Sequence, residues 1–294
     1  MTFLPRSEIL TFEEIVRVAT VAHELGVDSM RITGGEPLVR KDLASLVKRL
    51  GSLGRIDLSL TTNGMFLAPV ATELADAGLS RVNISCDSLR PERFAAMRRR
   101  GDLDRVLAAM DAAEAAGLRP LKVNVVLMAG VNDDEIVDFG AFARSTGRIV
   151  RFIEFMPLDA DGSWGRDQMV SGDRVLEEIG AAWPIEPIVS TVSDPAPAER
   201  YRFVDGGGEI GVISSVSRPF CGTCDRLRLT ADGSIRNCLF SDDEVSVRDL
   251  MRQGGSDADI ALALRTAVWA KASGHGINDD DFEAPLRSMS MIGG

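Results

Sequence analysis

The sequence predicts an α/β fold built on parallel strands, followed by a smaller unit. Between residues 29 and 156, short apolar runs rich in β-branched residues alternate with runs of helical spacing. This alternation indicates a parallel sheet, either open or closed into a barrel. After about residue 160 the alternation stops, and a connector rich in Pro, Ala and Ser at residues 191–200 precedes two hairpin-like runs. We therefore expect one domain at residues 1–160 and a second at residues 161–294.

The first expected element is a helix that begins after Thr11. Thr11 is a good N-cap residue and Glu14 follows three positions later, which predicts a capping box. Leu10 and Ile15 have the spacing of an apolar contact across the helix start. A βα barrel begins with a strand, so this series is expected to lack its first strand. The strand at 29–33 would then be an apolar sheet edge, prone to pairing or aggregation.

The remaining elements are expected in a regular order. The expected strands are 29–33, 56–62, 81–86, 121–128 and 149–156. The expected helices between them are 42–50, 67–77, 103–116 and 133–144. After the connector, we expect hairpins at 201–217 and 227–239, and helices at 245–251 and 257–272.

The charge and hydropathy of the chain exclude two classes of protein. The net charge is −11, with 44 acidic and 33 basic residues, whereas a general nucleic-acid binder needs a basic surface. No apolar run reaches the roughly 20 residues that span a bilayer, and the N-terminal residues show neither a basic leader nor an apolar export core. A cytoplasmic protein without a membrane or nucleic-acid partner is expected.

Polar and glycine-rich residues are expected at the ends of five strands. In parallel α/β folds, ligands bind at the carboxyl ends of the strands. Each segment alone fits an ordinary turn, but five in succession favour a ligand site. Gly34-Gly35 would let backbone approach a ligand, and Glu36 could accept from an amino group. The five segments are 33–37, 61–64, 85–88, Lys122 with Asn124, and Glu154 with Met156.

Three of the four cysteines form the pattern Cys221-x2-Cys224-x13-Cys238, which straddles an expected hairpin. A structural zinc site would need a fourth protein ligand. A redox pair would place the CxxC at a helix start rather than before a strand. A cubane iron–sulfur cluster held by three cysteines would leave one iron open to substrate. Spacing alone favours zinc slightly over iron–sulfur, with redox use last.

Two arginines follow the cysteine pair at alternate positions. Arg226 and Arg228 would point to one side of a strand, and two guanidinium groups beside a metal site suit a phosphorylated ligand. A solvated pair on an exposed strand fits equally well without further support. Arg31 and Lys122 give that support, because a cation inside a sheet needs a specific partner.

Taken in order, these segments resemble the GTP 3',8-cyclase family, radical S-adenosylmethionine (SAM) enzymes of molybdenum-cofactor biosynthesis. The resemblance runs from residue 4 to the last residue. It implies an incomplete (β/α)6 barrel of the radical SAM type without its first strand, and a smaller α+β domain with a three-cysteine site for a second [4Fe–4S] cluster and GTP. The matching segments are RITGGEPLVRKDL, TTNG, VNISCDSL, KVNVVLM, RFIEFM, FCGTCDRLRLTADG and the terminal Gly-Gly.

The resemblance also implies a role for individual residues. SAM contacts are expected at Gly35, Ser85 and Met156. The residues expected to contact GTP are Arg31, Thr61, Lys122, Arg226, Leu227 and Arg228. The ligands expected for the second [4Fe–4S] cluster are Cys221, Cys224 and Cys238, and the tail expected to reach into the active site is Gly293-Gly294.

The family reaction implied is a radical cyclisation. A first [4Fe–4S] cluster splits SAM, and the resulting 5'-deoxyadenosyl radical removes the 3' hydrogen of GTP. The C3' radical then attacks C8, which gives (8S)-3',8-cyclo-7,8-dihydroguanosine 5'-triphosphate. Expected partners are a low-potential electron donor, the downstream enzyme that forms cyclic pyranopterin, and a second copy in a homodimer.

One family motif is not present in the printed residues. The first cluster of the family is held by CxxxCxxC, and outside Cys221, Cys224 and Cys238 the chain has only Cys86, which we interpret as a small core residue. The chain as given is therefore expected to be N-terminally truncated and inactive. The alternative is a non-catalytic protein that binds GTP and an iron–sulfur cluster or zinc.

Overall fold

The computed structural model describes residues 4–98, 101–158, 164–189 and 197–292. The chain divides into two compact units, which are described separately. Unit 1 combines residues 1–61, 73–80 and 225–294, and unit 2 combines residues 62–72 and 81–224. Unit 1 thus contains both the first and the last elements of the chain, whereas unit 2 is almost continuous in sequence.

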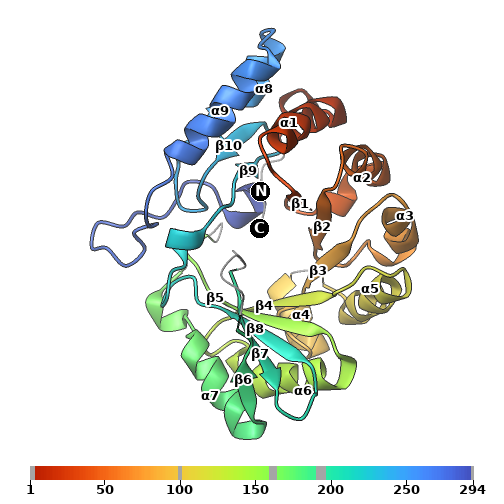
Figure 1. Cartoon of the computed structure of the whole chain (residues 1–294). Helices are drawn as coiled ribbons and strands as arrows, with labels where there is room; N and C mark the ends of the chain where they lie inside the picture. The colour runs from red at the N-terminus through yellow and green to blue at the C-terminus, as the bar shows by residue number, and fades with distance from the viewer. Residues whose placement is uncertain (1–3, 99–100, 159–163, 190–196, 293–294) are drawn as a thin grey trace. The chain divides into compact units, whose positions relative to one another are not determined.

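Unit 2 is built on a mixed sheet (Figure 1). Its first four strands in spatial order are parallel, and the last two continue the sheet in antiparallel fashion. The strands, in spatial order, are β3 (Arg81–Ser85), β4 (Lys122–Leu127), β5 (Ile149–Glu154), β8 (Glu209–Ile213), β7 (Glu199–Phe203) and β6 (Ile185–Pro187).

Helices cover the apolar face of this sheet. In β4, Val123, Val125 and Leu127 are buried because alternate side chains point to the same face. Phe139 of α6 packs edge-to-face on Phe152 of β5, with ring centroids 6.3 Å apart. The helices of unit 2 are α4 (Pro91–Arg98), α5 (Leu103–Ala115), α6 (Ile136–Thr146) and α7 (Gly172–Ala182), with short 3-10 turns η4 (Asp133–Glu135), η5 (Arg166–Gln168) and η6 (Cys221–Thr223).

Unit 1 contains a parallel pair, β1 (Ser29–Ile32) with β2 (Asp57–Thr62), and a small antiparallel sheet. The strands of the small sheet are β9 (Arg228–Leu229), β10 (Ser234–Arg236) and β11 (Val245–Ser246). The helical elements of unit 1 are η1 (Arg6–Glu8), α1 (Phe12–Glu24), η2 (Pro37–Val39), α2 (Leu43–Gly51), α8 (Val247–Arg252), α9 (Asp257–Trp269) and α10 (Met289–Ile292). The elements η3 (Ala68–Val70) and α3 (Ala71–Asp76) lie in the segments where the units alternate.

The core of unit 1 joins elements from both ends of the chain. Val18 and Val21 of α1 pack in one apolar cluster with Ile235 of β10 and with Ile260 and Leu264 of α9. Ion pairs reinforce this contact at the surface: Arg17 Nε lies 2.7 Å from Asp257 Oδ1, and Arg252 Nε lies 2.8 Å from Glu14 Oε1. The first helix is therefore completed by residues more than two hundred positions later.

The predicted first helix and the five predicted strands are confirmed. Thr11 Oγ1 accepts from the Glu14 N–H, and Glu14 Oε2 accepts from the Thr11 N–H, so the capping box forms as expected. Among the described residues, β1 pairs with β2 alone, which leaves its other edge without a strand partner there.

Other elements differ from the prediction. The hairpin at 201–217 forms, but β8 joins the large sheet beside β5 rather than a separate unit, because its apolar residues are buried like those of a central strand. Helices α4, α7 and α10 were not predicted. Residues 190–196 of the predicted connector lie outside the described residues, and Glu199 already belongs to β7. The domain boundary near residue 160 stays a prediction, since the units combine segments from both ends of the chain.

No helix in the described part of the chain combines the length and the apolar character needed to cross a bilayer.

Candidate functional site

A polar face on the sheet of unit 2 is the strongest candidate site. Asn83 lies opposite Lys122 in the strand register, and Ser85 lies opposite Asn124. Asn124 in turn lies opposite Arg151. Because side chains alternate between the two faces of a strand, these residues project from the same face. The polar face consists of Asn83, Ser85, Lys122, Asn124 and Arg151.

The polar face carries buried positive charge. Arg151 is only 6% exposed, and its Nε and Nη2 donate to Asn124 Oδ1 at 2.9 and 2.7 Å. This amide acceptor is neutral, and it orients the guanidinium group. Lys122 adds a half-buried ammonium group one strand away. Two cations beside amide and hydroxyl groups form a set of donors suited to phosphate and ribose oxygens.

The predicted position of Lys122 and Asn124 at a strand end is wrong. Lys122 begins β4 and Asn124 lies inside it, because pairing with β5 continues as far as Leu127. Both side chains point from the body of the strand into the polar face, so the site extends deeper along the sheet than its carboxyl edge. The predicted GTP contact of Lys122 stays a prediction.

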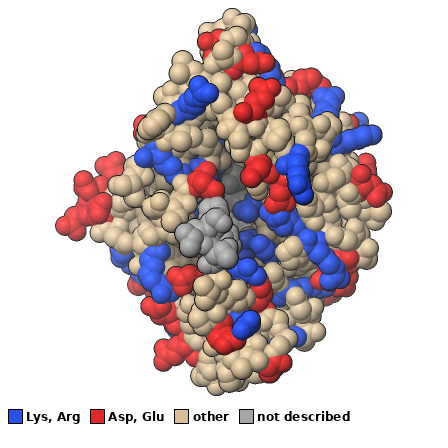
Figure 2. All heavy atoms as spheres, in the orientation of Figure 1, with Lys and Arg blue, Asp and Glu red and all other residues tan. Residues whose placement is uncertain are grey.

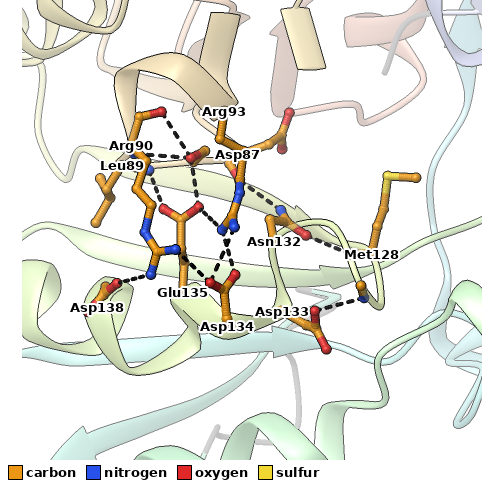
Figure 3. A network of polar contacts seen from close by, with 12 residues as sticks. Asp87, Leu89, Arg90, Arg93, Met128, Asn132, Asp133, Asp134, Glu135 and Asp138 are labelled. Carbon is orange, nitrogen blue, oxygen red and sulfur yellow. Dashed lines mark hydrogen bonds and ion pairs between the residues drawn. The ribbon is translucent and has the colours of Figure 1, made fainter. Parts of the chain in front are cut away.

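Ser85, the expected SAM contact, ends β3 and leads into a loop whose backbone is fixed by a buried network (Figure 3). Glu135, which is fully buried, accepts from Ser88 Oγ at 2.7 Å and from the Leu89 N–H at 2.6 Å. Arg93 Nη1 donates to the same carboxylate at 2.6 Å. Glu135 therefore ties the loop after β3 to the turn before α6.

Asn132 completes this network (Figure 3). Its Nδ2 donates to the carbonyl oxygens of Asp87 and Val126 at 2.7 and 2.9 Å, and its Oδ1 accepts from the Met128 N–H at 2.8 Å. Asp87 Oδ1 also accepts from the Val126 N–H at 2.9 Å. Because Asp87 is hydrogen-bonded to residues 39 and 45 positions later through partly buried contacts, these bonds hold the loop after Ser85 against the end of β4 and the turn before α6.

Met156, another expected SAM contact, lies two residues beyond the end of β5 and is half-buried. Its carbonyl accepts from the Leu158 N–H at 2.8 Å, which turns the chain sharply after the strand. Met156 thus follows a strand of the polar face, as the sequence predicted.

In unit 1, two expected GTP contacts share a strand face. Arg31 of β1 lies opposite Ser59 of β2, and Thr61 follows Ser59 by two residues, so their side chains leave the same face. The glycine turn after β1 lies close to the C-terminal segment, because a Cβ placed on Gly35 would be 3.4 Å from the Ser290 carbonyl oxygen. Gly293 and Gly294 themselves lie outside the described residues.

The expected GTP contacts at 226–228 are anchored to the segment after α9 of the same unit. Lys271 Nζ donates to the carbonyl oxygens of Arg226 and Asn237 at 2.9 and 2.8 Å. Leu227 packs against the apolar core of unit 1. The strand is shorter than predicted, since β9 begins only at Arg228, so Arg226 precedes it.

Cys221, Cys224 and Cys238 are free thiols that form no disulfide. Cys221 begins η6 and Cys224 follows it, both half-buried, while Cys238 lies two residues after β10. The Phe240 N–H donates to Cys238 Sγ at 3.5 Å, a contact that stabilises thiolate charge as in iron–sulfur proteins. Free thiols with such a donor fit an iron–sulfur cluster chemically. Within the described ranges, no group of three His, Cys, Asp or Glu side chains is gathered as for a metal ion, so the three-cysteine site stays a prediction.

Cys86 is a buried core residue, as the sequence analysis expected. Burial, followed by the nearby Asp87 carboxylate, raises the pKa of the Cys86 thiol to about 12. The thiol is therefore protonated at neutral pH and is unsuited to metal binding, which requires a thiolate.

Several residues that shape the site escaped the sequence analysis. Asn83 and Arg151 belong to the polar face, while Asn132 and Glu135 fix the loop after Ser85. The period-two polar positions in KVN and RFIE were a usable signal. The register that aligns them across strands cannot be read from one sequence.

The surface charge of the chain is mixed. On the face shown in Figure 2, Lys and Arg side chains are interspersed with Asp and Glu side chains. The net charge of −11 is therefore compatible with local basic sites for an anionic ligand.

Comparison with known families gives the class of the protein. Residues 2–143 match the radical SAM superfamily, and residues 148–277 match the family described as Molybdenum Cofactor Synthesis C. The chain is thus a radical SAM protein with a molybdenum-cofactor synthesis C-terminal region.

Similar curated proteins define the family more narrowly. The chain is 45% identical to the GTP 3',8-cyclase of Rhodopirellula baltica, covering 99% of this chain and 82% of that protein. It is 46% identical to the GTP 3',8-cyclase of Streptomyces coelicolor, covering 100% and 87%, and 45% identical to that of Mycolicibacterium smegmatis, covering 100% and 83%. The chain belongs to the GTP 3',8-cyclase family, and the predicted resemblance is confirmed.

Among solved structures, Streptococcus suis SuiB is similar with a TM-score of 0.49 and 17% identity, over 59% of this chain and 40% of that one.

Proposed function

We propose that this chain contributes the GTP-binding and cyclising part of a GTP 3',8-cyclase, which converts GTP to (8S)-3',8-cyclo-7,8-dihydroguanosine 5'-triphosphate in molybdenum-cofactor biosynthesis. The observation that carries the proposal is the polar face of unit 2, where Ser85 and Lys122 project from one side of the sheet. Family membership supports GTP as the ligand of this set of donors.

Each group on the polar face has a role that follows from its chemistry. Lys122 and Arg151 would hold triphosphate oxygens, since two cations close together suit a polyanion. Asn83, Asn124 and Ser85 would accept from or donate to hydroxyl groups of the ribose or of SAM. Holding the nucleotide in one orientation is the main contribution the protein makes to a radical cyclisation.

Other site residues are proposed on the family resemblance. Arg31, Thr61 and 226–228 would contact GTP, and Gly35 and Met156 would contact SAM. Cys221, Cys224 and Cys238 would hold a [4Fe–4S] cluster with an open iron for the guanine. Gly293 and Gly294 would take part in catalysis as the tail of the active site.

A SAM-cleaving [4Fe–4S] cluster would supply the carbon radical that removes the 3' hydrogen of GTP. The printed residues offer no thiolate set for it, because Cys86 is buried with a pKa of about 12 and the other three cysteines are assigned to the second cluster. We therefore propose that a preparation limited to these residues binds GTP without turnover. The alternative function is a non-catalytic protein that binds GTP together with an iron–sulfur cluster or zinc. It is favoured by the same lack of further thiolates in the printed residues.

The decisive test is the metal content after anaerobic reconstitution. Iron, acid-labile sulfide and zinc are measured per chain, and product formation is followed with GTP, SAM and a low-potential reductant. About four irons per chain would support a single cubane at the three-cysteine site. Zinc without iron would refute the cyclase assignment of that site, and about eight irons with turnover would refute the proposed inactivity.

The proposed partners follow from the reaction. GTP and SAM would be substrates, a low-potential carrier would supply the electron, and the next enzyme would form cyclic pyranopterin from the product. We also propose that the reaction takes place in the cytoplasm and that the assembly is a homodimer.

A further inference from the structure

Glu154 is a buried carboxylate at the end of β5 that accepts four hydrogen bonds from neutral donors. It is only 2% exposed. Its Oε1 accepts from the Gly172 N–H at 3.0 Å and from Ser217 Oγ at 2.5 Å. Its Oε2 accepts from the N–H groups of Val216 and Ser217, both at 2.8 Å. Four donors converge on one side chain, which is the pattern of an internal anion site.

The close approach of α7 to this carboxylate depends on a glycine. Gly172 is the first residue of α7, so its N–H points out of the helix start, where the helix dipole favours negative charge. A Cβ at Gly172 would lie 2.4 Å from Ser214 Oγ and 2.5 Å from a methyl group of Val212. Only glycine lets the helix start reach both β8 and Glu154.

The segment held by Glu154 leads directly to the cysteine pair. Val216 and Ser217 follow β8, and only three residues separate Ser217 from Cys221. The turn is closed by the Arg218 N–H, which donates to the Ser214 carbonyl at 3.2 Å. Pro219 then fixes one backbone angle of the short connection. The position of Ser217 therefore limits where Cys221 and Cys224 can lie.

We propose that Glu154 is a positioning residue that fixes the Cys221 and Cys224 pair for cluster binding. The inference rests on the proposed function, because it assumes that these cysteines hold the cluster. Glu154 also lies two residues before Met156, the expected SAM contact. The same carboxylate therefore links the end of β5, next to Met156, to the segment that leads to Cys221. All the contacts that carry the argument lie within unit 2.

Glu154→Gln is the main test variant. The glutamine keeps the shape of the side chain, but its NH2 group must face at least one backbone N–H, so the two donors repel and the turn loosens. Glu178→Gln is the matched control, because Glu178 lies on α7 and is partly exposed in an ion pair with Arg174. Ser217→Ala is a milder variant that removes one donor and keeps the backbone N–H groups.

The first readout is the loss of iron from the reconstituted protein to a chelator. Outer contacts of metal ligands typically change metal affinity about 10- to 100-fold, so we expect Glu154→Gln to lose iron about tenfold faster than the unmodified chain. The electron paramagnetic resonance spectrum of the reduced cluster should change as well. Glu178→Gln should match the unmodified protein in both measurements, and Ser217→Ala should lie between. The inference would be overturned if Glu154→Gln and Ser217→Ala both fold but lose iron at the rate of the unmodified protein and give its spectrum.

Hydrogen exchange separates this inference from the proposed function. The amides of Val216 and Ser217 should exchange about tenfold faster in the Glu154→Gln variant, whether or not a cluster is bound. Unchanged exchange in that variant, or in Ser217→Ala if the first does not fold, would overturn the positioning role even if iron binds. If the chain takes up no iron but Glu154→Gln still speeds amide exchange at Val216 and Ser217, the cluster site is refuted. The role of Glu154 in holding this segment then still stands.

Discussion

At the scale of single residues, charge on the polar face decides which ligand the sheet can hold. Arg151 is held by an amide oxygen and Lys122 lies on the neighbouring strand. Neither position is explained by packing, since the apolar side chains of β4 point to the other face. Cations that are buried, like Arg151, or half-buried, like Lys122, are typical of binding sites for anions.

Replacing Lys122 with Met should weaken GTP binding about 10- to 100-fold, because losing a hydrogen bond to a charged group costs about 1.5–3 kcal/mol. Guanosine, which has no phosphate, should bind almost as before. The measurement is anaerobic calorimetric titration with both ligands. Lys48→Met, on the exposed face of α2, is the matched control and should change neither affinity. An equal loss for GTP and guanosine would show that Lys122 does not act on the phosphates.

Residue types were predicted better than residue positions. Arg31, Lys122 and the cysteine pattern stood out because cations and thiols are chemically unusual in strands and hairpins. Arg151 did not, because an arginine inside RFIE becomes informative only when the register places it opposite Asn124. Glu154 was noted as a strand-end residue, but its partners come from segments about eighteen and sixty positions later.

At the scale of elements, the 3-10 turn η4 before α6 acts as a clamp on the loop after β3. Glu135 lies in that turn and reaches Ser88, Leu89 and Arg93. Around it, Arg93 and Arg90 form exposed ion pairs with Asp134, which lower the pKa of that carboxyl group. Exposed pairs add little stability, so the buried carboxylate carries most of the effect.

Glu135→Gln should therefore lower the free energy of unfolding by about 2–4 kcal/mol, because an amide NH2 would face buried donors and Arg93 would lose its buried counter-charge. Asp138→Asn, which removes an exposed partner of Arg90, should cost less than about 1 kcal/mol. Urea unfolding at neutral pH compares the two variants. If both variants lose a similar amount of unfolding free energy, the burial of Glu135 does not determine its contribution to stability.

Most elements were predictable because local signals agreed with the fold. The capping box of α1, the glycine turn between β9 and β10 and the apolar strands are all local patterns. The place of β8 was not, because an Ile-Gly-Val-Ile run fits both a hairpin arm and a central strand. Its choice of neighbour depends on pairing with β5, a strand about sixty positions earlier, and such pairing is a tertiary property.

At the scale of the whole molecule, the two units divide the chain in a way that sequence order hides. Unit 1 takes helices from both ends, and their shared cluster includes Val18 and Ile260. The predicted division at residue 160 was based on composition and on the alternation of strand and helix patterns. Contacts between segments distant in the chain produce no pattern that can be recognised in a single sequence.

Ile260→Ala should destabilise unit 1 by about 2–4 kcal/mol, since it leaves a cavity in a fully buried site. Because α1 packs on the same cluster, cleavage at Arg17 by trypsin should also increase. Leu262→Ala, on the same helix but 63% exposed, should change neither. Urea unfolding and timed proteolysis test both variants, and an unchanged cleavage rate in Ile260→Ala would show that α1 does not depend on this core.

The pairing of α1 with α8 and α9 has a consequence for synthesis on the ribosome. The apolar side of α1 leaves the exit tunnel long before its partners in β10, α8 and α9 are translated. At about 5–20 residues per second, this interval is on the order of 10 to 50 s. The nearly continuous unit 2 can fold during this interval. Until its partners emerge, α1 exposes its apolar side to solvent on the nascent chain. A chaperone that binds this side of α1 would therefore act during this interval.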